Sequence, residues 1–198
     1  MTLREDLLRL QWAQLRHDEA YHKDVVIMPL AERIKHMALH NAKYTAYFFD
    51  AIDDVDQAKL TKTLTDAFVI VLATANTLNQ DIGTDLGASA DDSQSFQSLG
   101  ASLAEGIGRN DADDYWLVRN FARHAGRLAK VCESWDHLEN ILFRDEMKRC
   151  NLELLKVILA EASDRQLDLA ESYKSRMRQV EQRSIFDKLF QEGAGGEA

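Results

Sequence analysis

Residues 60 to 78 carry a run of apolar side chains with the period of an α-helix. The apolar positions recur every three or four residues, at Leu60, Leu64, Ala67, Phe68, Val71, Leu72, Ala75 and Leu78. Because an α-helix turns once in about 3.6 residues, this spacing places all of them on one face. The chain has one proline in 198 residues, so few positions would interrupt helices of this kind. The run therefore predicts an amphipathic helix packed against a core.

The rest of the chain also favours helix. No stretch alternates apolar and polar residues in the way of a half-buried strand. The spacing predicts helices at about residues 2–22, 29–50, 96–107, 112–141, 145–163 and 168–189, and one from the turn at 53–57 to Gly83. Pro29 suits the first turn of its helix, and Gly83 suits a helix end. We therefore expect an all-α helical bundle.

The two halves of the chain resemble each other at an offset of 87 residues. The shift aligns seven identical pairs without a gap: Ala38/Ala125, Ala42/Ala129, Lys43/Lys130, Leu72/Leu159, Ala73/Ala160, Ala75/Ala162 and Asp81/Asp168. Duplication of a helix pair would leave this pattern, although alanine-rich helices also match by chance. The expected organisation is a single domain over 1–198, with a helix-pair unit at 28–83, a linker and short helix at 84–111, a second unit at 112–190 and a disordered tail at 191–198.

The net charge of −9 limits the partners that this chain can have. It disfavours binding to a nucleic acid polymer or to an anionic membrane surface, since both carry negative charge. No apolar run approaches the roughly 18 residues of a membrane span, and the amino terminus lacks the apolar segment of a signal peptide. The two cysteines, Cys132 and Cys150, form no CxxC motif and are expected to be reduced core thiols of a cytoplasmic protein.

Residues 65–82, TDAFVIVLATANTLNQDI, resemble the third helix of the MazG-type nucleotide pyrophosphohydrolases, an all-α family. Asp66 takes the place of the last acid in the family's ExxD motif. Residues 36–48, HMALHNAKYTAYF, resemble the preceding helix, and residues 124–137 and 168–183 resemble divergent members. The resemblance implies a MazG-like fold and hydrolysis of a nucleoside triphosphate to a monophosphate and pyrophosphate.

The chemistry that this resemblance implies depends on four acids, an EExxE motif on one helix and ExxD on the next, which cage Mg²⁺ with oxygens. In the first half the corresponding positions read His36, Met37, His40, Thr63 and Asp66. In the second half they read Arg123, His124, Arg127, Cys150 and Glu153. One acid remains in each half, so the cage is incomplete. Asp66 and Glu153 are the candidate ligands for Mg²⁺ or Mn²⁺ at these positions.

A second candidate metal site follows one stripe of one predicted helix. Glu32, His36 and His40 fall at i, i+4 and i+8. Imidazole and carboxylate ligands together suit Zn²⁺, Mn²⁺ or Fe²⁺ better than Mg²⁺. The preceding helix offers three further candidates, namely Asp18, Glu19 and His22. A solvated or interface face explains the same stripe, because six histidines in a helical chain easily produce this spacing.

The candidates for binding the phosphates of a nucleotide include Lys43, Arg123, Arg127 and Lys130. The resemblance adds Arg176, because members of the family often carry phosphate-binding basic residues in this carboxyl-terminal stretch. A salt-bridged helix surface would explain the same residues. Asp66 likewise has two interpretations, as a metal ligand or as an acid in the first turns of its helix, where it stabilises the helix dipole.

Two functions from different classes follow from the sequence. The first is a nucleoside triphosphate pyrophosphohydrolase of the MazG-like kind. The second is a catalytically silent helical protein that has lost the metal site and binds a ligand or a partner, with a homodimer expected in both cases. Nucleophilic catalysis is disfavoured, because the chain has no GxSxG motif and no glycine-rich phosphate loop.

Overall fold

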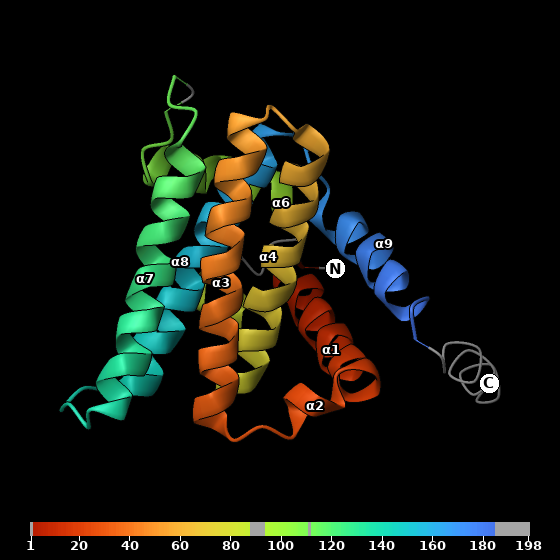
Figure 1. Cartoon of the computed structure of the whole chain (residues 1–198). Helices are drawn as coiled ribbons and strands as arrows, with labels where there is room; N and C mark the ends of the chain where they lie inside the picture. Colours follow the sequence, from red (N-terminus) through yellow and green to blue (C-terminus); the bar gives the residue numbers. More distant parts are fainter. Residues whose placement is uncertain (1, 88–93, 111, 185–198) are drawn as a thin grey trace.

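The fold was analysed in a computed structural model, which describes residues 2–87, 94–110 and 112–184. Across these ranges the chain forms nine α-helices and no strand (Figure 1). The helices are α1 (Leu3–Tyr21), α2 (Lys23–Val26), α3 (Leu30–Asp53), α4 (Gln57–Leu78), α5 (Ile82–Asp85), α6 (Phe96–Gly106), α7 (Trp116–Asp136), α8 (Phe143–Asp164) and α9 (Leu169–Glu181). The all-α prediction is confirmed for these residues. The predicted tail at 191–198 and part of the predicted linker lie outside them.

Four long helices, α3, α4, α7 and α8, form the centre of the bundle (Figure 1). α3 packs against α4 and α7, and α8 packs against α7 and α4. Phe48 of α3 and Phe121 of α7 are fully buried and meet edge to face, with ring centroids 5.1 Å apart. α6 packs on α8, whereas α1 and α9 pack on α4. The space between α1, α3, α4 and α9 holds the candidate site described below.

α6 approaches α8 closely because residue 100 has no side chain. A Cβ built on Gly100 would lie 2.4 Å from the carbonyl oxygen of Leu159 and 2.6 Å from the Cβ of Ser163. Hydrogen bonds tie the two helices at the same place, since Gln97 donates to the carbonyl of Ser163 at 2.7 Å and the Ser163 hydroxyl donates back to the Gln97 carbonyl at 2.9 Å. The glycine therefore permits a helix contact that any larger residue would disturb.

The end of α4 differs from the sequence prediction. The helix ends at Leu78 and not at Gly83, because Asn79 adopts the left-handed conformation with φ of 51°. Asparagine tolerates this conformation better than most residues, so it can end a helix as glycine does. Gly83 lies instead within the short helix α5, where an added Cβ would come within 2.9 Å of the Arg4 side chain.

The ends of α4 and α8 have the same geometry, 87 residues apart. The shared features are the left-handed residues Asn79 and Gln166, the 2.8 Å backbone hydrogen bonds from Gln80 to Ala75 and from Leu167 to Ala162, and the capping aspartates Asp81 and Asp168 of the next helix. The backbone at these two helix ends therefore matches at the offset of 87 residues.

α7 ends at Asp136, earlier than the predicted boundary near residue 141. Leu138 ends it by adopting a φ of 54°, and Val55 does the same after α3, also with a φ of 54°. These two residues are 83 positions apart rather than 87. The two helix pairs therefore differ at the connection between their helices and return to a common register in α4 and α8.

The two cysteines lie in the core. Cys132 and Cys150 are free and buried, which confirms that these thiols belong to the core. Burial raises the pKa of Cys132 to about 11, so its thiol stays protonated at neutral pH. Within the described ranges, none of the helices combines the length and the apolar character that a membrane crossing needs.

Candidate functional site

A cavity of about 280 Å³ lies between α1, α3, α4 and α9, and we call it the first cavity. Besides Asp18 and His22 on its α1 wall, it brings together five residues singled out in the sequence: His36, His40, Lys43, Asp66 and Arg176. α3 supplies the first three, α4 supplies Asp66 and α9 supplies Arg176. The helix period explains the α3 contribution, since residues four apart lie on the same face. α9 packs on α4 and so brings Arg176 next to Asp66.

Asp66 forms an ion pair across this cavity. Its carboxylate accepts hydrogen bonds from Arg176 Nε at 2.5 Å and from Nη2 at 3.2 Å, and both side chains are largely buried. α4 begins at Gln57, so Asp66 lies more than two turns inside the helix. The interpretation of Asp66 as a first-turn acid is therefore wrong. The third nitrogen of the guanidinium, Nη1, is buried without a hydrogen-bond partner.

Two histidines and a lysine form a chain of contacts on α3. His40 Nδ1 lies 3.0 Å from Lys43 Nζ, and the Nε2 atoms of His36 and His40 lie 3.1 Å apart. An ammonium group can only donate, so His40 accepts at Nδ1, carries its proton on Nε2 and donates to His36. Burial, the charge of Lys43 and the neighbouring His36 lower the pKa of His40 to about 4. His40 is therefore neutral near pH 7.

These contacts do not fit the Mg²⁺ cage that the resemblance implies. Met37 and Thr63 offer no carboxylate, and the Asp66 carboxylate is engaged by Arg176. A metal-bound histidine usually donates its other ring N–H to a carboxylate or carbonyl, whereas His40 accepts from Lys43 at that nitrogen. In place of a metal cage, the structure has a hydrogen-bonded chain from Lys43 to His36 beside the ion pair of Asp66 and Arg176.

The α1 wall of the first cavity carries a second group of polar side chains. Ligand atoms of His17, Asp18 and His22 all lie within 4.8 Å of one another. Gln14 donates to the Asp18 carboxylate at 2.8 Å, and His17 is only 7% exposed. Sequence reasoning named Asp18 and His22 but missed His17 and Gln14. The spacing of His17 and His22 around the end of one helix was the signal that could have found them.

The other predicted metal ligands lie elsewhere. Glu32 is exposed on α3 and does not line the first cavity. Glu19 is exposed and pairs with Arg16 at 3.7 Å. Glu153 contacts Lys156 at 2.7 Å on α8. The stripe that begins at Glu32 therefore enters the cavity only through its two histidines.

A smaller second cavity, of about 140 Å³, lies between α7 and α8. It is lined by His124, Arg127, Arg149, Cys150 and Glu153. Four of these residues occupy second-half family positions, 87 residues after positions in the first half. Burial lowers the pKa of His124, although Glu153 opposes this shift. Both helix pairs therefore have a cavity at corresponding places.

The remaining predicted phosphate-binding residues lie on the surface of α7. Arg123 is exposed and donates to the side-chain carbonyl of Asn120 at 3.2 Å. Lys130 is exposed and pairs with Glu133 at 3.0 Å and Glu139 at 3.1 Å. Neither residue lines the first or the second cavity. The contacts of Lys130 match the salt-bridged surface that was the alternative interpretation, whereas Arg123 contacts a neutral amide.

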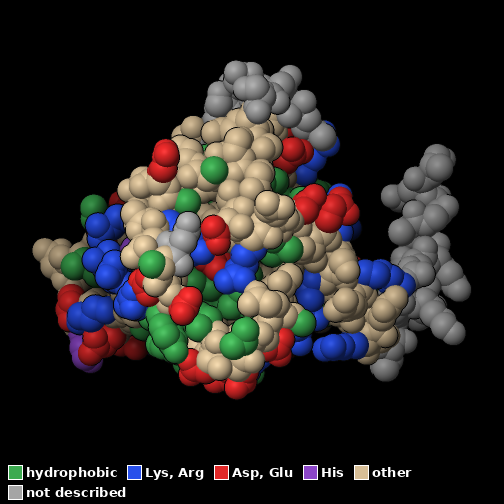
Figure 2. All heavy atoms as spheres, turned by 90° about the horizontal axis from the view of Figure 1, so that it is seen from above, with side chains coloured by type: hydrophobic (Ala, Val, Ile, Leu, Met, Phe, Trp, Pro, Cys, Tyr) green, Lys and Arg blue, Asp and Glu red, His purple; other side chains and the backbone are tan. Residues whose placement is uncertain are grey.

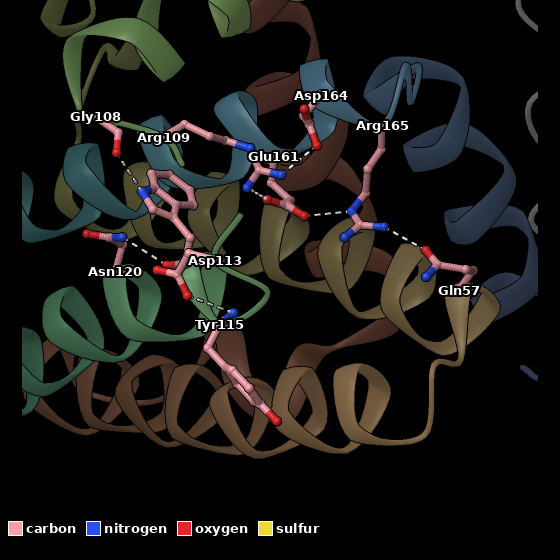
Figure 3. A network of polar contacts seen from close by, with 10 residues as sticks. Gln57, Gly108, Arg109, Asp113, Tyr115, Asn120, Glu161, Asp164 and Arg165 are labelled. Atoms are coloured by element: carbon pink, nitrogen blue, oxygen red, sulfur yellow. Dashed lines mark hydrogen bonds and ion pairs between the residues drawn. The ribbon is translucent and has the colours of Figure 1, made fainter. Parts of the chain in front are cut away.

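A third polar region lies at the end of the bundle that carries the α3–α4 connection (Figure 3). The Glu161 carboxylate is 1% exposed and lies between two guanidinium groups, accepting from Arg109 at 2.5 Å and from Arg165 at 2.6 Å. Arg165 also donates to Gln57 at 2.6 Å. The buried acid is thus neutralised by arginines, which gives the network a role in holding α8 to its neighbours.

Figure 2 shows the same end of the molecule from above. Lys and Arg side chains lie among Asp and Glu side chains and apolar ones across the described part of this face. The mixture gives this face no dominant charge of either sign.

Comparison with family models, with curated proteins and with solved structures finds no match to this chain. The chemistry of the site therefore rests on its own geometry. The first cavity combines a lysine, an arginine whose Nη1 has no hydrogen-bond partner, two imidazoles and an apolar floor that includes Val69, Ile70 and Ala73. Such a lining suits a small molecule with an anionic group and an apolar part.

Proposed function

We propose that this chain is a MazG-like helical protein that binds a nucleotide in the first cavity. The phosphates would lie against Lys43 and Arg176, and the base or sugar would contact the apolar side chains of α4. Hydrolysis to a monophosphate and pyrophosphate is the second candidate, which the resemblance of residues 65–82 implies. In this proposal the protein is a homodimer, and light scattering after size-exclusion chromatography checks that prediction.

The proposal rests on two cationic side chains of the first cavity, those of Lys43 and Arg176. Lys43 contacts His40 at 3.0 Å and the face of the Tyr44 ring at 4.5 Å, and neither contact neutralises its charge. Desolvation lowers the pKa of Lys43, and Asp66 opposes the shift. Arg176 keeps a buried Nη1 without an acceptor. Cationic donors on α3 and α9 therefore face one cavity, and a phosphate would satisfy both.

The repeated backbone geometry supports the MazG-like architecture within this proposal. The sequence offset of 87, the matching ends of α4 and α8, and the two corresponding cavities agree with duplication of a helix pair. α3 also packs on α7 while α4 packs on α8, so corresponding helices contact each other, as a pseudo-twofold arrangement requires. Superposition of residues 30–82 on 117–169 tests the duplication, and poor overlap of the helix axes would exclude it.

The binding function is favoured over hydrolysis by the state of the family positions. Asp66 is the one acid among the first-half motif positions, and its carboxylate is already paired with the guanidinium of Arg176. Both nitrogens of His40 are engaged, Nδ1 by Lys43 and Nε2 by His36, so His40 has no free lone pair with which to activate water. We therefore expect binding to be readily measured and hydrolysis to be slow or absent.

The test measures the binding of fluorescent ATP, GTP, dUTP and dCTP analogues by anisotropy, first without divalent metal. We expect at least one nucleotide to bind, and Lys43→Gln to weaken it by about 10-fold to 100-fold, the value of one charge-assisted hydrogen bond. Lys62→Gln is the matched control, because Lys62 is exposed on α4 and does not line the first cavity. Equal weakening by both variants, or no binding of any nucleotide at millimolar concentration, would contradict the proposal.

A second assay separates binding from hydrolysis. The same nucleotides are incubated with the protein and Mg²⁺ or Mn²⁺, and pyrophosphate release is measured. Release that Lys43→Gln abolishes would establish the pyrophosphohydrolase. Binding without release in any combination would establish the silent ligand-binding protein.

A further inference from the structure

We propose that His17, Asp18 and His22 bind a divalent transition metal ion on the α1 wall of the first cavity. Their ligand atoms come from the end of α1 and the residue that caps it, and they lie within 4.8 Å of one another. None of these residues occupies a position of the EExxE and ExxD motifs. The metal site therefore does not depend on the nucleotide proposal, and metal binding alone tests it.

The buried, unpaired imidazole of His17 is independent evidence that this site binds an ion. The side chain is more than nine-tenths buried, and neither Nδ1 nor Nε2 has a hydrogen-bond partner. A buried polar atom left unpaired costs about 1–3 kcal/mol, and such atoms are rare in folded proteins. A metal ion at one ring nitrogen would remove this cost. The burial also holds the ring in place, so the imidazole is already positioned for binding.

The two nitrogens of His17 face different carboxylates. Nδ1 lies 4.0 Å from an oxygen of Asp18, and Nε2 lies 3.9 Å from an oxygen of Glu181 at the end of α9. One nitrogen thus faces the ligand group, and the other faces an acceptor for its N–H. In metal-bound histidines the second ring N–H commonly donates to a carboxylate, so Glu181 would complete this arrangement by approaching Nε2 by about 1 Å.

Asp18 is also held in position before any ion arrives. Gln14 is 2% exposed and donates its Nε2 to the Asp18 carboxylate at 2.8 Å. This hydrogen bond leaves the rest of the carboxylate able to coordinate. Bound metals place neighbouring ligand atoms roughly 3 to 3.5 Å apart, so separations of up to 4.8 Å need to close by at most about 1.3 to 1.8 Å. The contact between His17 and Asp18, at 4.0 Å, needs about 0.5 to 1 Å of this, and rotation of the less buried His22 can supply its own approach.

The ligand set selects the class of ion. Two imidazoles and one carboxylate suit Zn²⁺, Fe²⁺, Co²⁺ or Mn²⁺, whereas Mg²⁺ and Ca²⁺ prefer oxygen ligands. Three protein ligands leave at least one coordination position for water or a bound molecule, as in catalytic zinc sites. The open position would face the same cavity as Lys43 and Arg176.

The experiment titrates Co²⁺ into the full chain after removal of metals with a chelator. Cobalt is the probe because its visible absorption reports both binding and coordination geometry. We expect one Co²⁺ per chain with a dissociation constant in the micromolar range or below, displaced by Zn²⁺. His22→Ala and Asp18→Asn should each weaken binding at least 10-fold, because each removes one of three ligands.

Two controls keep the result interpretable. His137→Ala removes an exposed histidine on the α7–α8 connection and should leave Co²⁺ binding unchanged. Circular dichroism of each variant establishes that it is folded, and His22→Ala is the decisive variant because His22 is less buried than His17. Absence of stoichiometric binding would overturn the site. Binding that survives both His22→Ala and Asp18→Asn would also overturn it.

Discussion

The carboxylate of Asp66 on α4 is held by the guanidinium of Arg176 on α9, a residue 110 positions later in the chain. The two hydrogen bonds measure 2.5 Å and 3.2 Å, and the side chains are 18% and 15% exposed. The pair joins a helix that packs on the outside of the bundle to one at its centre. It also neutralises the one acid that the first-half family positions retain.

The ion pair predicts strong coupling between Asp66 and Arg176. Asp66→Asn should lower the free energy of unfolding by about 2 kcal/mol, between the values for exposed and fully buried pairs. A surface acid would change it by about 0.5 kcal/mol or less. Urea unfolding of Asp66→Asn, Arg176→Gln and the double variant gives the interaction energy. Additive effects of the two substitutions would show that the pair contributes nothing specific.

Two glycines in helices should respond to alanine in opposite directions. Gly100→Ala places a Cβ against the Leu159 carbonyl and should destabilise the protein by about 1–3 kcal/mol, as overpacking does. Gly126→Ala on α7 meets no atom within 4 Å and should stabilise it by about 0.5–1 kcal/mol, because alanine favours helix. Thermal unfolding of both variants measures the difference. A stabilising Gly100→Ala would mean that α6 and α8 are not in close contact.

The sequence predicted most of the helices because their signals are local. Apolar period and helix formers determine α1, α3, α4 and α8 within a few residues of their observed bounds. Three predicted ends are misplaced. The ends after Leu78 and after Asp136 depend on single residues in the left-handed conformation, and the helix expected to reach residue 189 ends at Glu181. Sequence reasoning favoured glycine at such positions, but Asn79 and Leu138 occupy them. Both residues are exposed, and the local backbone hydrogen bonds from Gln80 to Ala75 and from Glu139 to Ser134 close these helix ends without a glycine.

The candidate site was predictable only in part, because some of its contacts join helices that are far apart in the sequence. His36 and His40 were brought together by their spacing on one helix, which is a local property. The ion-pair partner of Asp66 is Arg176 on α9, a residue that the spacing within α3 and α4 does not indicate. The burial of His17 likewise depends on how α1 packs on α4. Neither relationship is encoded in a short stretch of sequence.

Substitution of the buried Glu161 should reduce stability much more than substitution of the more exposed Asp164. Glu161→Gln leaves Arg109 and Arg165 without their shared carboxylate and should cost about 3 kcal/mol, as breaking a buried pair does. Asp164 also pairs with Arg109, but it is 39% exposed, so Asp164→Asn should cost less than about 1 kcal/mol. Chemical denaturation compares them. Equal losses would show that burial does not set the strength of this network.

The final prediction concerns the protonation of His40 in protein freed of metal. Its pKa of about 4 lies below that of the unfolded chain, about 6.5, so the unfolded state binds a proton first. The protonated form therefore favours unfolding. This destabilisation is absent above pH 6.5, grows as the pH falls toward 4, and is complete below that value.

Substitution of Lys43 distinguishes the causes of this shift. Burial is the largest cause, followed by the charges of Lys43 and His36, with His22 acting in the same direction and Asp66 opposing them. Lys43→Met should therefore raise the pKa of His40 while leaving it below 6.5, because burial remains. Titration of the imidazole resonances by NMR measures both values. A wild-type His40 that titrates near 6.5, with no response to Lys43→Met, would show that this ring is solvated and that the chain from Lys43 to His36 does not form.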